Sequence, residues 1–79
     1  MNSDNEYREQ IEQRVLDLIE EHLEEEVDMD TRLRDYFDEL DVLELFMAIE
    51  EEFEVEISPL DEELIETPAD FVDFICKHS

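Results

Sequence analysis

Apolar residues near the start of the chain recur at steps of three and four positions, the spacing that places side chains on one face of an α-helix. The residues on this face are Tyr7, Ile11, Val15, Leu18, Ile19 and His22. The pattern predicts a long helix over about residues 5–23. Because the chain has no glycine and only two prolines, it favours helices joined by short connections.

The residues between Leu23 and Asp38 lack a sustained period and predict a long loop. Apolar residues that could anchor this loop on the core are Val27, Met29, Leu33 and either Tyr36 or Phe37. From Asp38 to Phe53 the helical period returns and predicts a second helix. Its apolar residues are Leu40, Leu43, Phe46, Met47, Ile49 and Phe53.

Two short segments, each with a capping residue followed by a proline, predict where the remaining helices begin. Ser58 is a helix-capping residue with a proline at the first helical position after it, so a short helix is expected over about residues 59–65. Thr67 and the proline after it repeat the signal and begin a last helix, which extends to about residue 77. Its apolar face consists of Phe71, Val72, Phe74 and Ile75. The predicted fold is all-α, a four-helix bundle with three longer helices and one short third helix.

Length and cysteine content indicate one small intracellular domain. A chain of 79 residues can form a single domain, residues 1–79, with one modest core. The single Cys76 allows no internal disulfide, and the first residues lack the basic and apolar character of a signal peptide. No apolar run approaches the ~20 residues needed to cross a bilayer. We expect a cytoplasmic monomer without membrane insertion.

The charge of the chain narrows the class of partner. It carries 28 acidic and 5 basic residues, a formal charge of −23. A field of this sign makes nucleic acid an unsuitable ligand and disfavours anionic membrane surfaces, whereas it suits a basic patch on another protein. The alternative is that the charge only keeps a small domain soluble.

The predicted order of helices, with a long loop after the first, resembles the acyl carrier proteins. The stretch from Asp38 to Phe53 follows the second helix of that family almost position for position, including the Asp before and the Leu after its modification site. The match continues in the last third of the chain through Ile57, Ile65, Val72, Asp73, Phe74 and Ile75. The resemblance implies the carrier-protein fold over essentially the whole chain.

One residue departs from what this resemblance implies. Family members carry acyl groups on a 4'-phosphopantetheine arm joined to the serine of an Asp-Ser-Leu motif, and here the motif is Asp38-Glu39-Leu40. Glu39 has no hydroxyl that could form a phosphodiester. The loop that leads into Asp38 is about two residues shorter than is usual in the family. We therefore expect no cofactor at this position. Glu39 could mimic the phosphate charge, could be tolerated at a helix start once carrier function is lost, or could be an engineered substitution.

No other residue offers a convincing attachment or catalytic site. Ser58 and Thr67 are interpreted as helix caps, and the other hydroxyls, Ser3, Thr31 and Ser79, are not flanked by Asp and Leu. Residues 28–33 begin like a calcium loop but lack its central glycine and place Arg32 at a ligand position. Cys76 and His78 lack two further ligands for a metal, and no pair of carboxylates stands out as an acid and base. We expect neither an enzyme nor a specific metal site, although divalent cations could bind loosely.

The second helix has more apolar residues than one buried stripe needs. By the resemblance, Leu45, Phe46, Ile49 and Phe53 face inward, and the outer face binds partner enzymes through the residues Asp38, Leu40, Asp41, Leu43, Glu44, Met47, Glu50 and Glu51. The alternative places Leu40, Leu43 and Met47 in the core.

Three functions remain open from the sequence. The first is a non-enzymatic module that docks on the basic surface of a partner enzyme, in fatty-acid, lipid or polyketide metabolism. The second is a functional carrier with an atypical attachment or with non-covalent acyl binding. The third is an acidic decoy for a basic protein surface, including a DNA-binding one.

Overall fold

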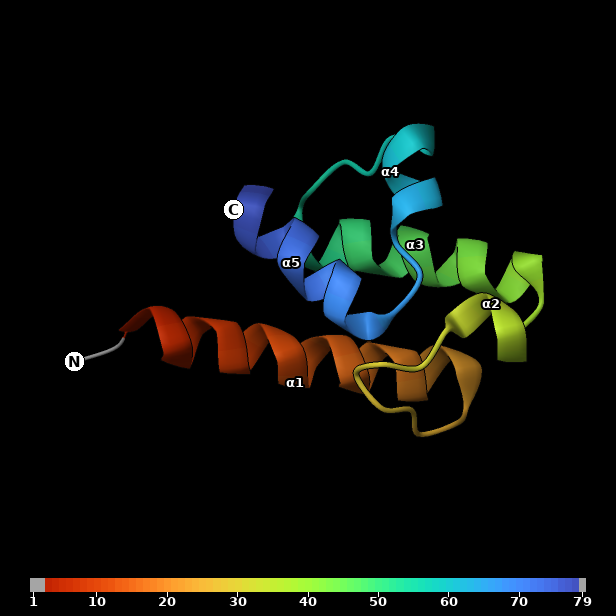
Figure 1. Ribbon diagram of the computed structural model, residues 1–79, viewed down its shortest axis with the longest axis horizontal. Helices are drawn as coiled ribbons and strands as arrows, with labels where there is room; N and C mark the ends of the chain where they lie inside the picture. The colour runs from red at the N-terminus through yellow and green to blue at the C-terminus, as the bar shows by residue number, and fades with distance from the viewer. Residues whose placement is uncertain (1–2, 79) are drawn as a thin grey trace.

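Five helices form the computed structural model, which describes residues 3–78 (Figure 1). They are α1 (Ser3–Leu23), α2 (Leu33–Tyr36), α3 (Glu39–Phe53), α4 (Pro59–Leu64) and α5 (Pro68–His78). No strand occurs among these residues, so the predicted all-α fold is confirmed. In Figure 1, α3 and α5 lie beside the long α1, and α4 stands at the far side of α3 from α1.

The core lies where α1, α3 and α5 meet. At its centre the rings of Phe46 from α3 and Phe71 from α5 pack at a centroid distance of 5.0 Å and an angle of 54°. The buried apolar residues are Ile11, Val15, Leu18, Ile19, Leu33, Val42, Leu45, Phe46, Ile49, Ile57, Ile65, Phe71, Val72, Phe74 and Ile75. Helix α4 buries none of its residues, so it lies on the core as an outer layer.

Helix α1 confirms the predicted apolar face in its middle but not at its ends. Ile11, Val15 and Ile19 are buried, whereas Tyr7 and His22 are exposed. At the N-terminal end the reason is length, because α1 has 21 residues while α3 has 15 and α5 has 11, and its first turns extend past both (Figure 1). The last turn of α1 stays packed, since Leu23 contacts the core, and His22 lies on the exposed side of that turn.

The predicted long loop contains a helix that the sequence pattern did not reveal. Residues Leu33–Tyr36 form the single turn α2, since a helix of 4 residues is too short to display a period. Leu33 is buried, and its backbone N–H donates to the carbonyl of Glu66 at 2.9 Å. Of the two candidate aromatic anchors, Phe37 packs against the core and Tyr36 is exposed.

Capping hydrogen bonds place the starts of α4 and α5 where the sequence predicted them. The Ser58 hydroxyl accepts from the N–H of Asp61, and a carboxylate oxygen of Asp61 accepts from the N–H of Ser58. At the start of α5, Thr67 Oγ1 accepts from the N–H of Asp70 at 3.2 Å, and the Asp70 carboxylate accepts from the N–H groups of Glu66 and Thr67. The interpretation of Ser58 and Thr67 as helix caps is confirmed.

Arginines on α1 connect it to the two helices that it packs against. Arg14 donates from Nε and Nη2 to the two carboxylate oxygens of Glu52 on α3, both at 3.0 Å. Arg8 donates from Nη2 to Asp73 on α5 at 2.8 Å. The hydrogen bonds from Arg14 hold the pKa of Glu52 below its ordinary value of 4.5. The depressed pKa means that the folded chain favours the ionised form of this carboxylate.

We expect the Arg14–Glu52 pair to stabilise the fold at neutral pH and to lose this effect in acid. A carboxylate with a lowered folded-state pKa contributes stability above its ordinary pKa, and this contribution disappears as pH falls through the lowered value. Glu52→Gln should therefore melt at a lower temperature than Glu51→Gln at pH 7. The two variants remove the same charge, and Glu51 forms no ion pair among the described residues. The melting temperatures of the two variants should converge well below pH 4.5. A difference between their melting temperatures that stays constant across the pH range would contradict the prediction.

Candidate functional site

Two acidic residues, Asp38 and Glu39, stand at the start of α3, and their carboxylates do not cap the helix. Asp38 is the N-cap residue but its side chain accepts no capping hydrogen bond, while its carbonyl accepts from the N–H of Val42 at 3.0 Å. Glu39 is the first helical residue, and both side chains are exposed. Unpaired N–H groups at a helix start favour such negative charges by about 0.3–1 kcal/mol. The start of α3 therefore presents negative charge to solvent.

Three of the five serine and threonine hydroxyls are used in local structure. Ser58 and Thr67 cap α4 and α5, and Thr31 Oγ1 accepts from the backbone N–H of Asp28 at 3.0 Å. Ser79 lies outside the described residues, and the placement of the Ser3 side chain is not described. No hydroxyl-bearing residue stands between Asp38 and Phe53.

The outer face of α3 carries an apolar ridge. Leu40 is 66% exposed, Leu43 44% and Met47 59%. We call these three residues the α3 ridge. The prediction that they face outward is confirmed, and the alternative that placed them in the core is wrong. The residues that α3 buries are Val42, Leu45, Phe46 and Ile49, whereas Phe53 is only partly buried against the core. Val42 was absent from the predicted inward set.

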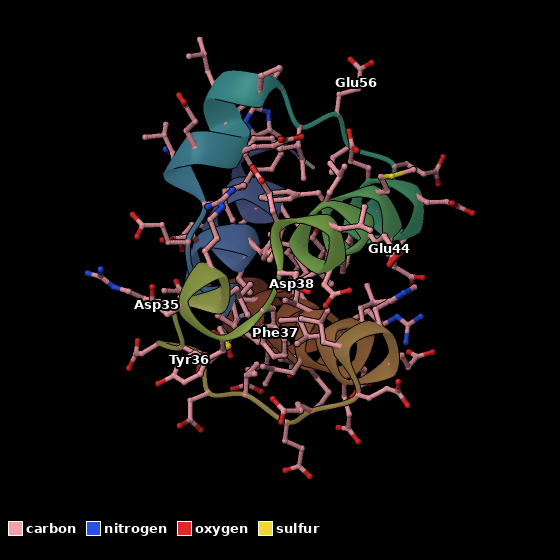
Figure 2. The ribbon with its side chains drawn as sticks, turned by 90° about the vertical axis from the view of Figure 1, so that its right-hand side faces the viewer. Asp35, Tyr36, Phe37, Asp38, Glu44 and Glu56 are labelled. Carbon is pink, nitrogen blue, oxygen red and sulfur yellow. The ribbon has the colours of Figure 1, made fainter. Side chains whose placement is uncertain are left out.

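The acidic residues around the ridge differ in their surroundings. Glu44 and Glu51 are exposed, and Asp41 is half-buried. Figure 2, which faces the start of α3, shows Asp38 at the near end of the helix and Glu44 on the side away from α4. Glu50 was expected on the outer surface, but its Oε2 accepts from the backbone N–H of Ile57 at 3.0 Å. Its carboxylate therefore also serves to hold the loop after α3.

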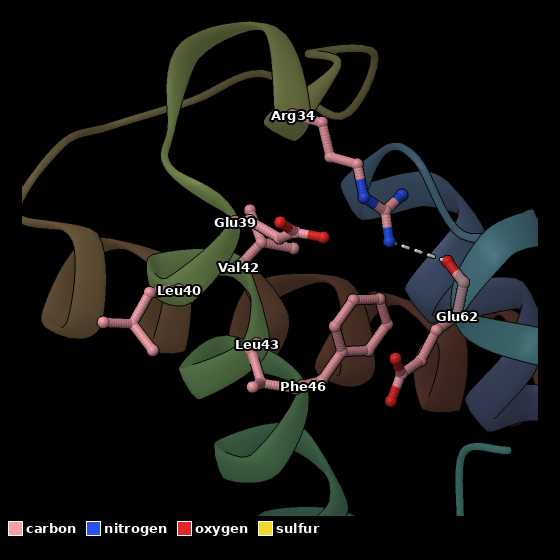
Figure 3. A pocket seen from close by; sticks show the side chains of 7 residues that line it. All are labelled: Arg34, Glu39, Leu40, Val42, Leu43, Phe46 and Glu62. Carbon is pink, nitrogen blue, oxygen red and sulfur yellow. Dashed lines mark hydrogen bonds between the residues drawn. The ribbon is translucent and has the colours of Figure 1, made fainter. Parts of the chain in front are cut away.

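A pocket of about 340 Å³ lies between α3 and α4 (Figure 3). We call it the α3–α4 pocket. Its apolar wall comes from α3, and its polar wall is formed by the carboxylates of Glu39 and Glu62 and by Arg34. The lining residues are Arg34, Glu39, Leu40, Val42, Leu43, Phe46 and Glu62. Two residues of the α3 ridge thus form one side of this pocket.

Arg34 holds α4 in place across this pocket. Its Nη2 donates to the carbonyl of Glu62 and its Nη1 to the carbonyl of Ile65, both at 2.9 Å, and its guanidinium carbon lies 5.7 Å from the centre of the Phe46 ring. A cation at the last carbonyls of a helix is favourable. Since α4 buries no residue, these bonds are a main link between α4 and the rest of the chain. The sequence reasoning did not single out Arg34, because its partners lie 28 and 31 residues away.

A second hollow, of about 650 Å³, lies between α1 and α3 on the other side of the ridge. We call it the α1–α3 groove. Met47 and Ala48 contribute apolar surface, and Arg14 in its wall is already bound to Glu52. The lining residues are Arg14, Leu18, Glu21, His22, Glu44, Met47, Ala48, Glu51 and Glu52. The ridge therefore passes from one hollow to the other, with carboxylates in both.

The other residues considered from the sequence are Cys76, His78 and the acidic clusters. No group of three or more His, Cys, Asp or Glu side chains is arranged to hold a metal ion there. Cys76 is a half-buried free thiol, and the His78 ring stacks on Phe74 at 4.2 Å. Of the helices in this part of the chain, none is long and apolar enough to cross a membrane.

Comparison with known proteins shows similarity to a curated protein over most of the chain. No family model matches the sequence. The acyl carrier protein of Clostridium perfringens (strain SM101 / Type A) is 41% identical to it over 58 residues, which covers 71% of this chain and 76% of the relative.

Proposed function

Because this chain belongs to the acyl carrier protein family, we propose that it retains the docking face of a carrier and lacks the means to carry cargo on the usual arm. It is a non-enzymatic protein that binds partner proteins of acyl metabolism through the outer face of α3. The observation that supports this proposal is the exposed α3 ridge with carboxylates on both sides. Apolar surface rimmed by polar groups is typical of protein interaction sites.

The charge of the chain determines which partner surface fits. A formal charge of −23 attracts a basic patch and repels a second copy of the chain, which favours a monomer. Charges at the rim of an interface act mainly on the rate of association, while the apolar centre supplies the contact energy. The partner therefore has a basic rim and an apolar centre.

We expect that a phosphopantetheinyl transferase will not modify the natural chain. The transfer requires a hydroxyl oxygen at the start of α3, and Glu39 supplies only a carboxylate, which forms no stable phosphodiester. Intact mass spectrometry after incubation with a broad-specificity transferase and coenzyme A should show an unchanged mass. Glu39→Ser, which restores the Asp-Ser-Leu motif, should gain one phosphopantetheine group. An adduct on the natural chain would contradict the proposal.

We expect affinity capture from the native cell to yield a partner that depends on the ridge. Leu43→Asp places a charge at the middle of the ridge and should reduce the captured partner at least about tenfold, which corresponds to ~1.4 kcal/mol. Leu64→Asp is the matched control, because it adds the same charge at a 74%-exposed leucine on α4. Equal loss with both variants would count against docking through α3. A captured nucleic-acid-binding protein in place of an acyl-metabolism enzyme would favour the decoy function.

The α3–α4 pocket supports a second candidate function, non-covalent binding of an acyl chain. Its wall of Val42, Leu43 and Phe46 is apolar, but Glu39 and Glu62 at its polar side disfavour an anionic head group. Titration with decanol, whose head group is uncharged, followed by NMR of the Phe46 ring and Leu43 methyl groups, tests it. Saturable shifts confined to these residues would establish this second function beside docking.

A further inference from the structure

We propose that the segment of the partner that binds the α3 ridge is a basic amphipathic helix, an inference that rests on the proposed docking function. Leu40, Leu43 and Met47 stand at positions i, i+3 and i+7, so they line up along the axis of α3. At 1.5 Å per residue the ridge extends about 10 Å, or about two helical turns. A facing helix presents apolar side chains with the same repeat.

The hollows on the two sides of the ridge fit helix packing. Helices pack by placing the ridge of one between the side-chain rows of the other. Leu40 and Leu43 form a wall of the α3–α4 pocket, and Met47 forms a wall of the α1–α3 groove. Side chains from a helix lying along the ridge can therefore enter both hollows. An added β-strand has nothing to pair with on this face, because residues 3–78 contain no strand with a free edge.

The charges in the two hollows indicate the sign of the flanking residues on that helix. Arg34 and Arg14 are the only cations that line these hollows within the described chain, and both are already bonded, Arg34 to two carbonyls and Arg14 to Glu52. The exposed carboxylates of Glu39, Glu44 and Glu51 form no ion pair among the described residues. Lysine or arginine on both sides of the apolar stripe of the partner helix would pair with them.

Designed peptides test the helix directly on the full chain. The probe is a fluorescently labelled leucine–lysine peptide with leucines at i, i+3, i+4 and i+7, and the control is a scrambled peptide of the same composition and charge. We expect the amphipathic peptide to bind at least about tenfold more tightly in fluorescence anisotropy at ~0.15 M salt, and to gain helicity in circular dichroism. Equal binding of both peptides would show attraction by charge alone and would overturn the inference.

Two variants localise the binding. Leu43→Asp should weaken binding of the amphipathic peptide at least about tenfold, and Leu64→Asp should change it by less than about twofold. Both variants add one negative charge at an exposed leucine, so long-range attraction is matched. Thermal melts of both variants check that each one folds. Equal effects of the two substitutions would overturn placement on the ridge.

Failure of this inference can be distinguished from failure of docking. Capture from cells could yield a partner that depends on Leu43 while the amphipathic peptide binds no better than the scrambled peptide. That result would refute the proposal of a partner helix and would leave the docking function standing. If the peptide binds the ridge but no captured partner depends on Leu43, the proposed docking function fails, while the fit of a basic helix to the ridge is supported.

Discussion

Phe46→Ala is expected to unfold the chain, or to leave it without a cooperative melting transition, in low-salt buffer at 25 °C. Phe46 is 2% exposed and its ring packs on Phe71 at 5.0 Å, so its removal leaves a cavity between α3 and α5. Truncation of a buried phenylalanine costs about 3–5 kcal/mol. A chain of 79 residues has a total unfolding free energy of about 4–12 kcal/mol. Because self-repulsion of the charges opposes the compact state, we expect this chain to lie toward the lower end of that range.

Circular dichroism and near-ultraviolet spectra measured through a thermal melt check this expectation. Leu64→Ala is the control, since it truncates a leucine that is 74% exposed and should shift the melting temperature little. Phe46→Leu keeps most of the buried volume and should cost less than the alanine variant. A cooperative transition of Phe46→Ala within a few degrees of the natural chain would show that the Phe46–Phe71 contact is not central to the core.

Added salt is expected to raise the melting temperature of the natural chain by several degrees. The 28 acidic residues repel one another, and the Debye length falls from about 30 Å at 0.01 M salt to about 8 Å at 0.15 M. For a domain of this size each kcal/mol of added stability raises the melting temperature by about 4–8 °C. Salt also weakens the Arg8–Asp73 and Arg14–Glu52 pairs, but exposed ion pairs contribute little to stability. The loss of repulsion therefore outweighs the loss of these pairs, and the melting temperature rises.

Thermal melts in sodium chloride and in magnesium chloride at equal ionic strength test this second expectation. Magnesium should stabilise at least as well, because loosely associated divalent cations neutralise neighbouring carboxylates more effectively. The same salt should partly restore structure to Phe46→Ala, since it removes a destabilising term that is independent of the cavity. A melting temperature that is flat or falls with salt would show that self-repulsion is not a principal cost in this fold.

The helix starts and the helical faces could be predicted because they depend on neighbouring residues. Ser58 and Thr67 form their capping hydrogen bonds with a residue three positions ahead, so a short sequence pattern is sufficient. The period of Ile11, Val15 and Ile19 predicted the buried face of α1 for the same reason. The resemblance to acyl carrier proteins, now supported by a relative at 41% identity, also separated the outward and inward residues of α3 correctly for most positions.

Other features depended on contacts between distant parts of the chain. Helix α2 is one turn long, and Leu33 within it is buried beside residues near the start of α5. The choice of Phe37 over Tyr36 as an anchor, and the inclusion of Val42 in the core, followed from which side chains the neighbouring elements cover. The exposure of Tyr7 followed from the greater length of α1, whose first turns extend past the helices packed on it.

The sequence by itself determined α1, α3, α4 and α5, the negative charge, the family and the absence of a hydroxyl at Glu39, because each depends on residue identity or on spacing of a few positions. The tertiary structure alone decided that the α3 ridge lies between two hollows and that Arg34 fixes α4 beside one of them. The physical reason is that a hollow and a carbonyl partner 31 residues away arise from packing, which the local pattern of side chains does not encode.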